Sequence, residues 1–476
     1  MDASAIALNA GVVGAGGAGF PTHVKLAAKA GCFIVNAAEC EPLIEVDKFL
    51  IRTRARDLVS GAAEMARAVG AGRVVLAIKK AYEKEIACLN AAIADNTASG
   101  GSATLCGCAA IDGSAASGGS AVKQSPTEIS VFKMRSFYPA GDEQLIAMLL
   151  TGKSVPERGI PLDVGVVVDN VATVLNFYDA CRGKPVTHRV LSVTGAVKNP
   201  CMLKVPVGTS VALCIEAAGG CADDSGIVMG GPMMGAFHDF SEINDLHIKK
   251  TDGNILVLPP GHKLTNMAKA DTRKLKNRAR AACIKCRMCT DLCPRYLSGH
   301  DMTPHVVMQN FYRIDEITDD RDFEKSFASA LNCSECGVCE NFACPMMLSP
   351  RRVNALVKPM LRTRGIDTVR NTEPRAREYF EERFAPTGRL TARLGLSRYV
   401  KHLGDELLEL TPDKVTISLK QQIGAPCIPC VRQGESVSAG DLIAAPPEGK
   451  LGANLHASVD GVVIAIEHDA IVIGSE

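Results

Sequence analysis

The chain has 476 residues, of which 47% are hydrophobic and 4% aromatic, and its formal net charge is +1. This length predicts several domains with buried cores, and the near-zero charge with few aromatic side chains argues against nucleic-acid binding. We expect no signal peptide and no membrane span, because no apolar run approaches the roughly 18 to 20 residues that a span needs. Nineteen cysteines in a chain far larger than a disulfide scaffold indicate a reducing cytoplasm.

A glycine-rich loop at residues 11–21 is the first motif along the chain. Its glycines remove side chains, so that backbone N–H groups can approach a ligand closely. Such a loop leading into a helix suits a phosphate, and Lys25 follows it closely enough to neutralise phosphate charge. A flexible glycine–alanine loop is the alternative. The motif is not the dinucleotide fingerprint, because no convincing strand precedes it.

An apolar strand at residues 32–35 comes next and ends in a polar group formed by Asn36, Glu39 and Glu41. Polar groups beyond the carboxyl end of a strand are where α/β folds bind ligands. Alternating helix and strand patterns follow at residues 55–69, 73–78 and 86–93. This alternation of helix and strand patterns predicts an α/β domain.

Residues 97–120 interrupt the pattern with the composition of a flexible loop. Cys106 and Cys108 within it are a candidate redox or metal pair, although incidental thiols are the simpler interpretation. Order returns with a helix that opens at residues 138–144, where acids in the first turn suit the helix dipole. A buried strand is then predicted at 164–168, followed directly by polar residues.

Four of these segments together resemble the FMN-binding 51-kDa subunit family of respiratory complex I. In that family the glycine loop and lysine face the FMN phosphate, asparagine and threonine hold the flavin, and acids line the nicotinamide side, with an aromatic stacked there at the position of Phe20. Asp142 departs from the family pattern, which has glutamate. The resemblance implies catalytic roles for Glu39 and Glu143. The FMN- and NADH-binding residues that it implies are Gly14, Gly16, Gly17, Phe20, Lys25, Asn36, Glu39, Glu41, Tyr138, Gly141, Asp142, Glu143, Asn170 and Thr173.

Residues 189–197 and 201–205 read as two strands joined by an Asn-Pro turn, and a short helix follows up to Ala218. The run Val-Thr-Gly-Ala-Val-Lys-Asn-Pro followed by Val-Pro-Val-Gly-Thr resembles the β-grasp module called SLBB. We therefore expect a small β-grasp domain after the flavin domain.

Two cysteine runs carry the most specific signal in the chain. They read C-x2-C-x2-C-x3-C-P and C-x2-C-x2-C-x4-C-P. Three thiolates at this spacing hold three corners of a cubane, while the fourth, next to proline, reaches the neighbouring cluster. Two zinc sites are the alternative, but zinc usually takes two separated cysteine pairs. The pattern resembles bacterial dicluster ferredoxins and predicts two [4Fe-4S] clusters. Their ligands would be Cys283, Cys286, Cys289 and Cys344 for one, and Cys293, Cys333, Cys336 and Cys339 for the other.

The segments around the cysteine runs are simpler. Residues 262–282 predict a basic helix, either solvated or a docking face for an acidic carrier. Residues 351–408 predict a charged helical linking segment. Short strands at regular spacing in the tail resemble the barrel-sandwich hybrid of biotinyl and lipoyl domains. No lysine follows Lys450, so we expect a structural or docking module instead of a swinging arm.

The predicted fold class is therefore multidomain, α/β with α+β: a complex I 51-kDa-like FMN domain, an SLBB β-grasp, a ferredoxin-type dicluster domain and a barrel-sandwich hybrid. The domain bounds are predicted at residues 1–182, 183–260, 261–358, 359–410 for a helical linker, and 411–476.

RnfC subunits of ion-pumping complexes and PduS-type cobalamin reductases share these parts, and the barrel at the C-terminus resembles the second layout. That resemblance implies electron flow from NADH through FMN and two clusters to a corrinoid. It also implies a cytoplasmic place in a microcompartment lumen, with a corrinoid adenosyltransferase or shell and enzyme proteins as partners. An RnfC-like NADH:acceptor subunit and a non-catalytic electron relay remain alternatives.

Overall fold

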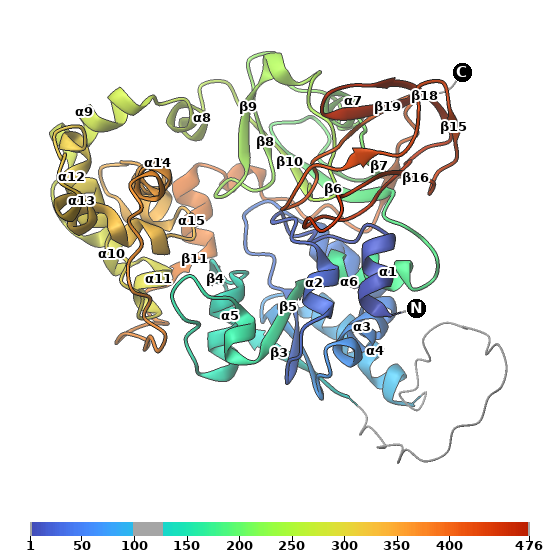
Figure 1. The fold of residues 1–476 in the computed structure, drawn as a ribbon, viewed down its shortest axis with the longest axis horizontal. Coiled ribbons are helices and arrows are strands. Elements are labelled where there is room, and N and C mark those ends of the chain that lie inside the picture. The colour runs from blue at the N-terminus through green and yellow to red at the C-terminus, as the bar shows by residue number, and fades with distance from the viewer. Residues whose placement is uncertain (1, 99–126, 475–476) are drawn as a thin grey trace.

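The structure is a computed structural model that describes residues 2–98 and 127–474. Cys106 and Cys108 lie outside the described residues. Helices dominate one end of the molecule, and the other end holds two groups of strands together with the helices of the N-terminal domain (Figure 1). None of the described helices combines the length and apolar character needed to cross a membrane.

The N-terminal domain is built on a parallel sheet in the order β3-β2-β1-β5. Neighbouring side chains of β1 point to opposite faces, so Phe33 packs into the core beneath α3 and α6 while Ile34 packs into the core beside α5. Coverage on both faces explains why the strands are continuous apolar runs. The elements are α1 (Ala3–Asn9), α2 (Thr22–Leu26), β1 (Cys32–Ala37), α3 (Val46–Ala68), β2 (Arg73–Lys79), α4 (Glu83–Ala98), β3 (Glu128–Met134), β4 (Phe137–Tyr138), α5 (Glu143–Thr151), β5 (Val166–Asn170) and α6 (Val171–Ala180).

Helix α3 is longer than the sequence pattern predicts. The pattern indicated residues 55–69, whereas the helix begins at Val46 and has non-helical dihedral angles at Arg54. This kink rotates the buried face between the two halves, so a single helical period fits only the second half. The first half is nevertheless buried through Phe49 and Ile51.

The second domain contains a six-stranded sheet in the order β12-β7-β6-β10-β8-β9, with α7 packed on it. Its two predicted strands appear as β6 and β7, which pair antiparallel. Its elements are β6 (His188–Gly195), β7 (Cys201–Pro206), α7 (Val211–Ala217), β8 (Gly226–Met229), β9 (Ala236–Asp239) and β10 (Asn254–Leu258).

The third domain is helical and surrounds the cysteine runs. Phe323 and Phe327 contact each other with tilted rings in its core, together with residues of α12 and α14. Its helices are α8 (Lys263–Ala268), α9 (Thr272–Ala282), α10 (Met288–Asp291), α11 (Pro294–Leu297), α12 (Pro304–Asn310), α13 (Asp320–Phe327) and α14 (Pro350–Thr363).

The segment at 359–410 differs from the helical linker that we expected. Among its residues, regular α-helix is confined to the end of α14 and to α15 (Thr387–Leu394). Two short strands complete distant sheets: β11 (Ala385–Pro386) pairs with β4, and β12 (Leu407–Glu409) pairs with β7. Backbone pairing with two other domains therefore overrides the helical composition of this segment.

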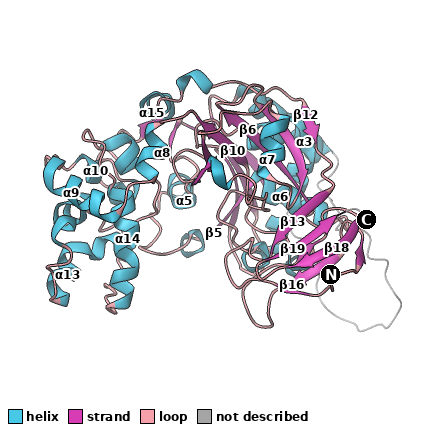
Figure 2. Ribbon diagram, turned by 90° about the horizontal axis from the view of Figure 1, so that it is seen from above, coloured by secondary structure: helices cyan, strands magenta, loops and turns pink. Residues whose placement is uncertain are grey.

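The tail folds as two small sheets, ordered β13-β19-β18-β15 and β14-β16-β17, around one hydrophobic core. These strands and the helices around the cysteine runs lie at opposite ends of the molecule (Figure 2). The strands are β13 (Lys414–Ser418), β14 (Ile428–Pro429), β15 (Ser436–Val437), β16 (Leu442–Ala445), β17 (Leu455–His456), β18 (Gly461–Ile466) and β19 (Ala470–Gly474).

Candidate functional site

The glycine loop is closed by its own backbone. The N–H of Gly14 donates to the carbonyl of Phe20 at 2.8 Å, and the N–H of Gly19 donates to the carbonyl of Gly14 at 3.0 Å. Residues 16–18 form the exposed tip, and within the described residues their three N–H groups make no hydrogen bond. A tip with three free backbone donors matches an anion site.

Two glycines of this tip are needed for its shape. Gly17 has φ +107° and faces open space, a conformation that side chains rarely adopt. A Cβ on Gly16 would lie 3.3 Å from the Cβ of Asn170, so a larger residue would be forced against the end of β5. The loop therefore forms a cradle that fits a phosphate, as the flavin prediction requires.

Lys25 lies on α2 and points to the carboxyl end of β5. Its ammonium is 3.2 Å from a carboxylate oxygen of Glu143 and 3.2 Å from one of Asp169. Burial alone lowers the pKa of Lys25, but the two acids together raise it above its ordinary value, so the lysine is charged. Asp169 was not among the predicted site residues. Its position directly after an apolar strand was the available signal.

Asp169 is 1% exposed, and one of its oxygens lacks a hydrogen-bond partner among the described residues. Burial raises its pKa to about 6, although Lys25 lowers it in part. A buried, half-satisfied carboxylate beside a cation is typical of functional sites.

The strand ends converge on the glycine loop through amide and hydroxyl groups. Thr173 accepts a hydrogen bond from the N–H of Ala15 at 2.9 Å. Asn36 donates to the carbonyl of Gly141 at 2.9 Å, which fixes the 138–143 loop against β1. Asn170 caps α6 by accepting from Ala172. Each of these residues makes a contact within the chain, and its contact with a flavin stays a prediction.

Arg189 is a further residue that the sequence interpretation missed. It comes from β6 of the second domain, is buried, and donates to the carbonyl of Ala15 at 2.7 Å. The second domain therefore helps to hold the glycine loop. A charged residue at the start of the strand predicted at 189–197 was the available signal.

The predicted acids after β1 are turned into the protein. Glu41 accepts from the N–H of Met233 at 3.0 Å, and burial raises its pKa to about 7. Glu39 has a positive φ of 29°, and burial followed by repulsion from Asp47 raises its pKa.

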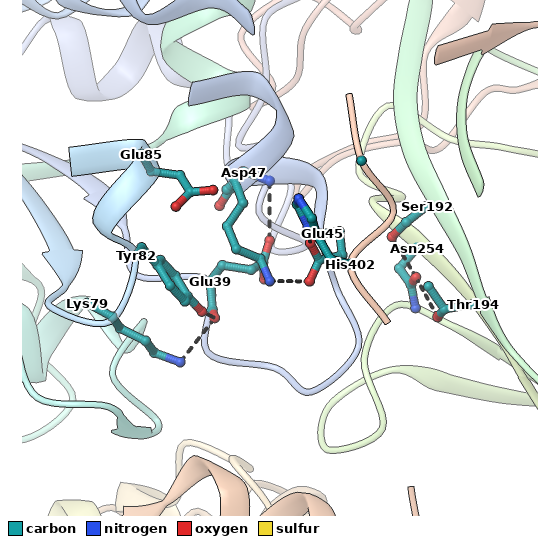
Figure 3. A network of polar contacts seen from close by, with 12 residues as sticks. Glu39, Glu45, Asp47, Lys79, Tyr82, Glu85, Ser192, Thr194, Asn254 and His402 are labelled. Atoms are coloured by element: carbon teal, nitrogen blue, oxygen red, sulfur yellow. Dashed lines mark hydrogen bonds and ion pairs between the residues drawn. The ribbon is translucent and has the colours of Figure 1, made fainter. Parts of the chain in front are cut away.

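Figure 3 shows Glu39 within a polar network that includes Lys79 and Tyr82. Both of those side chains donate to the Glu39 carbonyl, at 3.2 and 3.0 Å. Glu39 and Glu41 are half-buried and engaged in these contacts, whereas the side chain of Glu143 is 45% exposed.

The four cysteines that we predicted to hold one cluster line a single cavity. We call them the first thiol group: Cys283, Cys286, Cys289 and Cys344. The fourth of these comes from the second cysteine run, as a crossover requires. The N–H of Leu348 donates to the Sγ of Cys344 at 3.4 Å. Sulfur atoms that accept backbone hydrogen bonds are favourable cluster ligands.

The remaining four form the second thiol group: Cys293, Cys333, Cys336 and Cys339. Burial, together with the nearby thiols of Cys293 and Cys333, raises the pKa of Cys336 to about 12. The pKa of Cys339 is likewise raised first by burial and then by neighbours that include these three thiols. Such crowded, buried thiols fit a cationic metal group, which would stabilise their thiolate forms.

Within the described residues, no three histidine, cysteine or acidic side chains converge as closely as a single metal ion needs. The cysteine spacing therefore remains the ground for predicting two multi-iron clusters instead of two zinc sites.

The 138–143 loop, which contains predicted FMN- and NADH-binding residues, also contacts the second thiol group. We call the glycine loop, the strand ends and this loop together the flavin-like site. Tyr138 is 1% exposed, and its hydroxyl donates to the carbonyl of Cys336 at 2.7 Å. Asp142 caps α5 and pairs with both terminal nitrogens of Arg295, at 3.0 and 2.8 Å. Asp142 therefore uses its side chain on Arg295, two residues after Cys293, and does not extend freely towards a nucleotide.

Comparison with known families gives four matches in chain order. They are the Nuo51 FMN-binding domain at residues 8–179, the SLBB domain at 190–237, the 4Fe-4S dicluster domain at 282–349 and the RnfC barrel sandwich hybrid domain at 407–476. These matches confirm the predicted fold class and the predicted domain types.

Similar proteins cover nearly the whole chain. Cobalamin reductase PduS of Citrobacter freundii is 39% identical over 468 residues, which is 98% of this chain and 94% of that protein. The protein of the same name from Salmonella typhimurium strain LT2 is 40% identical with the same coverage. A component of the Na(+)-translocating ferredoxin:NAD(+) oxidoreductase complex of Acetobacterium woodii is 31% identical over 62% of this chain and 59% of that component. The chain belongs to the PduS cobalamin reductase family and contains FMN-binding and 4Fe-4S dicluster domains.

Proposed function

We propose that this protein is an NADH-dependent oxidoreductase that passes single electrons through FMN and two [4Fe-4S] clusters to a corrinoid. Its relatives of nearly equal length are named cobalamin reductases, and its domains match FMN-binding and dicluster families. A bound flavin supplies the conversion between a two-electron donor and one-electron carriers.

The observation that carries this proposal is the contact between the 138–143 loop and the residues around the second thiol group. Tyr138 and Asp142 belong to the flavin-like site, yet they bond to Cys336 and Arg295. Electrons would therefore pass from the flavin to the second thiol group, and from there to the first thiol group. Each group would hold one cluster through its four thiolates.

The chain's own residues have separate tasks in this proposal. The tip of the glycine loop would bind the flavin phosphate, with Lys25 as its cation. Asn36, Asn170 and Thr173 would orient the strand ends around the flavin. Glu143 would serve the nicotinamide, since its side chain is 45% exposed. Glu39 would also serve the nicotinamide, from a half-buried position that Tyr82 and Lys79 fix by donating to its main-chain carbonyl.

Anaerobic reduction by NADH tests the proposal. The flavin band should bleach first and the cluster band should follow. Gly16→Val and Lys25→Ala should lower the FMN content and leave the iron content intact. Glu143→Gln should keep FMN but slow the reduction by NADH, while dithionite should still reduce the clusters. Wild-type clusters that respond to dithionite but never to NADH would instead identify a relay that another protein feeds.

An Rnf-like role is the second candidate, because the tail matches the RnfC barrel family and the Acetobacterium protein is 31% identical. Co-purification with membrane proteins of such a complex would support it. For the corrinoid role we propose a cytoplasmic location inside a microcompartment, with an adenosyltransferase as partner. Co-purification with microcompartment shells would support that location.

A further inference from the structure

The first thiol group lies under an exposed and partly apolar surface. Residues 284–288 are all exposed, and so are residues 345–347 on the other side of the cavity. Ile284 and Met288 are 59% and 42% exposed, and Met346 and Met347 are each 39% exposed. Ile284 and Met346 also line the cavity that holds the four thiols. Exposed apolar side chains gathered at a redox site indicate a contact surface for a partner.

The rim of this surface is basic. Arg278 of α9 donates to the carbonyls of Met346 and Met347 at 3.2 and 2.9 Å, so the basic helix and the methionine loop share one face. Lys285 lines the cavity, and Arg280 lies in the last turn of α9, four residues before Ile284. Both are exposed, and neither has an ion pair within the described residues. Nearby Lys276 and Arg287 already have acidic partners in Asp315 and Asp291. Free positive charge therefore remains at the rim.

The position of this surface fits an electron exit. Helices α9 and α10, which flank it, lie at the end of the molecule opposite the barrel strands in both views (Figures 1 and 2). The predicted flavin site contacts the second thiol group through Tyr138. Among the four cysteines of the second thiol group none is exposed, whereas Cys286 of the first thiol group is exposed.

We propose that this surface docks an acidic protein that presents the one-electron acceptor, with Ile284, Met288, Met346 and Met347 in the contact and Arg280 and Lys285 at its rim. This inference rests on the proposed function and names the class of partner that receives its electrons. One electron would leave the reduced cluster of the first thiol group and reduce the partner by one electron, with no bond formed and no proton moved. Opposite charges would align the two proteins, and the apolar side chains would exclude water from the contact.

Two forms of one acceptor protein, one basic and one acidic, test the sign of the charge on this surface. Native cytochrome c is basic, and its fully succinylated form carries carboxylates on the same lysines around the same haem. The complete protein, with clusters reduced by dithionite and excess reductant removed, is mixed anaerobically with each form. We expect the acidic form to be reduced roughly tenfold or more faster at low salt, because electrostatic steering raises association rates by that order. The difference should shrink to about twofold near 0.5 M salt as screening takes over.

A charge-matched pair of variants localises the effect. Arg280→Glu with Lys285→Glu should reverse the preference, since both residues lie at the proposed rim. Lys184→Glu with Lys420→Glu changes the net charge equally at exposed positions of other domains, and should leave the preference intact. Ile284→Ser removes an exposed apolar side chain. Serine is the residue at the equivalent position of the second cysteine loop, Ser334. It should slow transfer to the acidic form at every salt concentration.

Three results would overturn the docking surface: equal rates for both cytochrome forms, a preference for the basic form, or an equal effect of the rim and control pairs. Dithionite supplies the electrons, so these results do not depend on NADH. Failure of NADH to reduce the flavin would contradict the proposed function alone. Iron content and NADH-driven bleaching, measured on every variant, separate a docking effect from a lost cluster.

Discussion

Residues 283–289 and 333–339 are two copies of one loop in opposite surroundings. Both turn through positive φ at the second position after the first cysteine, 56° at Lys285 and 57° at Glu335, and again two residues later, 66° at Arg287 and 79° at Gly337. Yet Met288 is 42% exposed, whereas Val338, its counterpart, is 1% exposed. Cysteine spacing fixes the backbone path, and the neighbouring domain decides which copy is buried.

This difference in burial orders the two loops along the proposed electron path. The second loop receives the hydroxyl of Tyr138 on the carbonyl of Cys336 and packs near Met233 of the SLBB domain. The first loop receives no comparable cover within the described residues and opens its cavity beside α9. The proposed electron path therefore has a buried cluster site at the second thiol group and an exposed cluster site at the first thiol group.

The largest effect should come from removing one fourth cysteine at a time. In Cys293→Ser, the second thiol group loses a ligand although the second cysteine run is intact, and iron should fall from about eight to about four atoms per chain. NADH should then bleach the flavin and leave the first cluster oxidised. In Cys344→Ser, iron should fall equally, but NADH should still reduce the cluster that remains. Electron paramagnetic resonance of the reduced proteins identifies which cluster is present, and a loss of the opposite cluster in each variant would refute the crossover.

Two ion pairs extend the comparison to stability. Asp142 pairs with Arg295 where both side chains are almost buried, while Asp291 pairs with Arg287 where both are well exposed. Asp142→Asn should cost about 3–5 kcal/mol, because it leaves a buried guanidinium without its charge partner. Asp291→Asn should cost at most about 1 kcal/mol. Urea unfolding of anaerobic protein measures both, and similar costs would show that the inner contact is no more important than the outer one.

The sequence alone predicted much of this comparison, because cysteine spacing is local information. The order of domains and the assignment of Cys344 to the first cavity follow from the same motifs. The strand at β1 and the polar residues beyond it were also visible, since buried parallel strands are continuous apolar runs. What these predictions share is that a short stretch of chain contains the whole signal.

The long-range contacts could not be predicted in this way. Nothing near Asp142 indicates that Arg295, 153 residues away, takes its carboxylate. Glu41 looked like a ligand-facing acid, but the N–H of Met233 binds it. Residues 407–409 have no strand pattern of their own, yet they extend the SLBB sheet as β12. In each case the decisive partner comes from another domain, which local periodicity does not record.

A smaller effect is expected from equivalent positions of the two loops. A Cβ on Gly337 would lie 3.1 Å from the carbonyl oxygen of Met233, and the glycine has φ +79°. Gly337→Ala should therefore cost about 1–2 kcal/mol from backbone strain, with the tight contact added. Arg287→Ala keeps a side chain at a similar φ and loses an exposed ion pair with Asp291 and an exposed hydrogen bond to Tyr296. It should cost at most about 1 kcal/mol. Thermal unfolding with intact clusters compares them, and a larger cost at Arg287 would reverse the assignment of inner and outer loops.

The smallest expected effect concerns the rate at which iron is lost. Local opening needs little free energy where a segment is exposed and has few buried contacts, and residues 284–288 meet both conditions. An iron chelator added anaerobically should therefore remove the cluster of the first thiol group several-fold faster than that of the second. Electron paramagnetic resonance of samples taken over time and reduced with dithionite follows each cluster separately. Cys293→Ser and Cys344→Ser, each retaining one cluster, serve as single-phase references. A common rate for both clusters in the wild-type protein would mean that iron leaves through unfolding of the whole dicluster domain, and the greater exposure of the outer loop would then have no kinetic consequence.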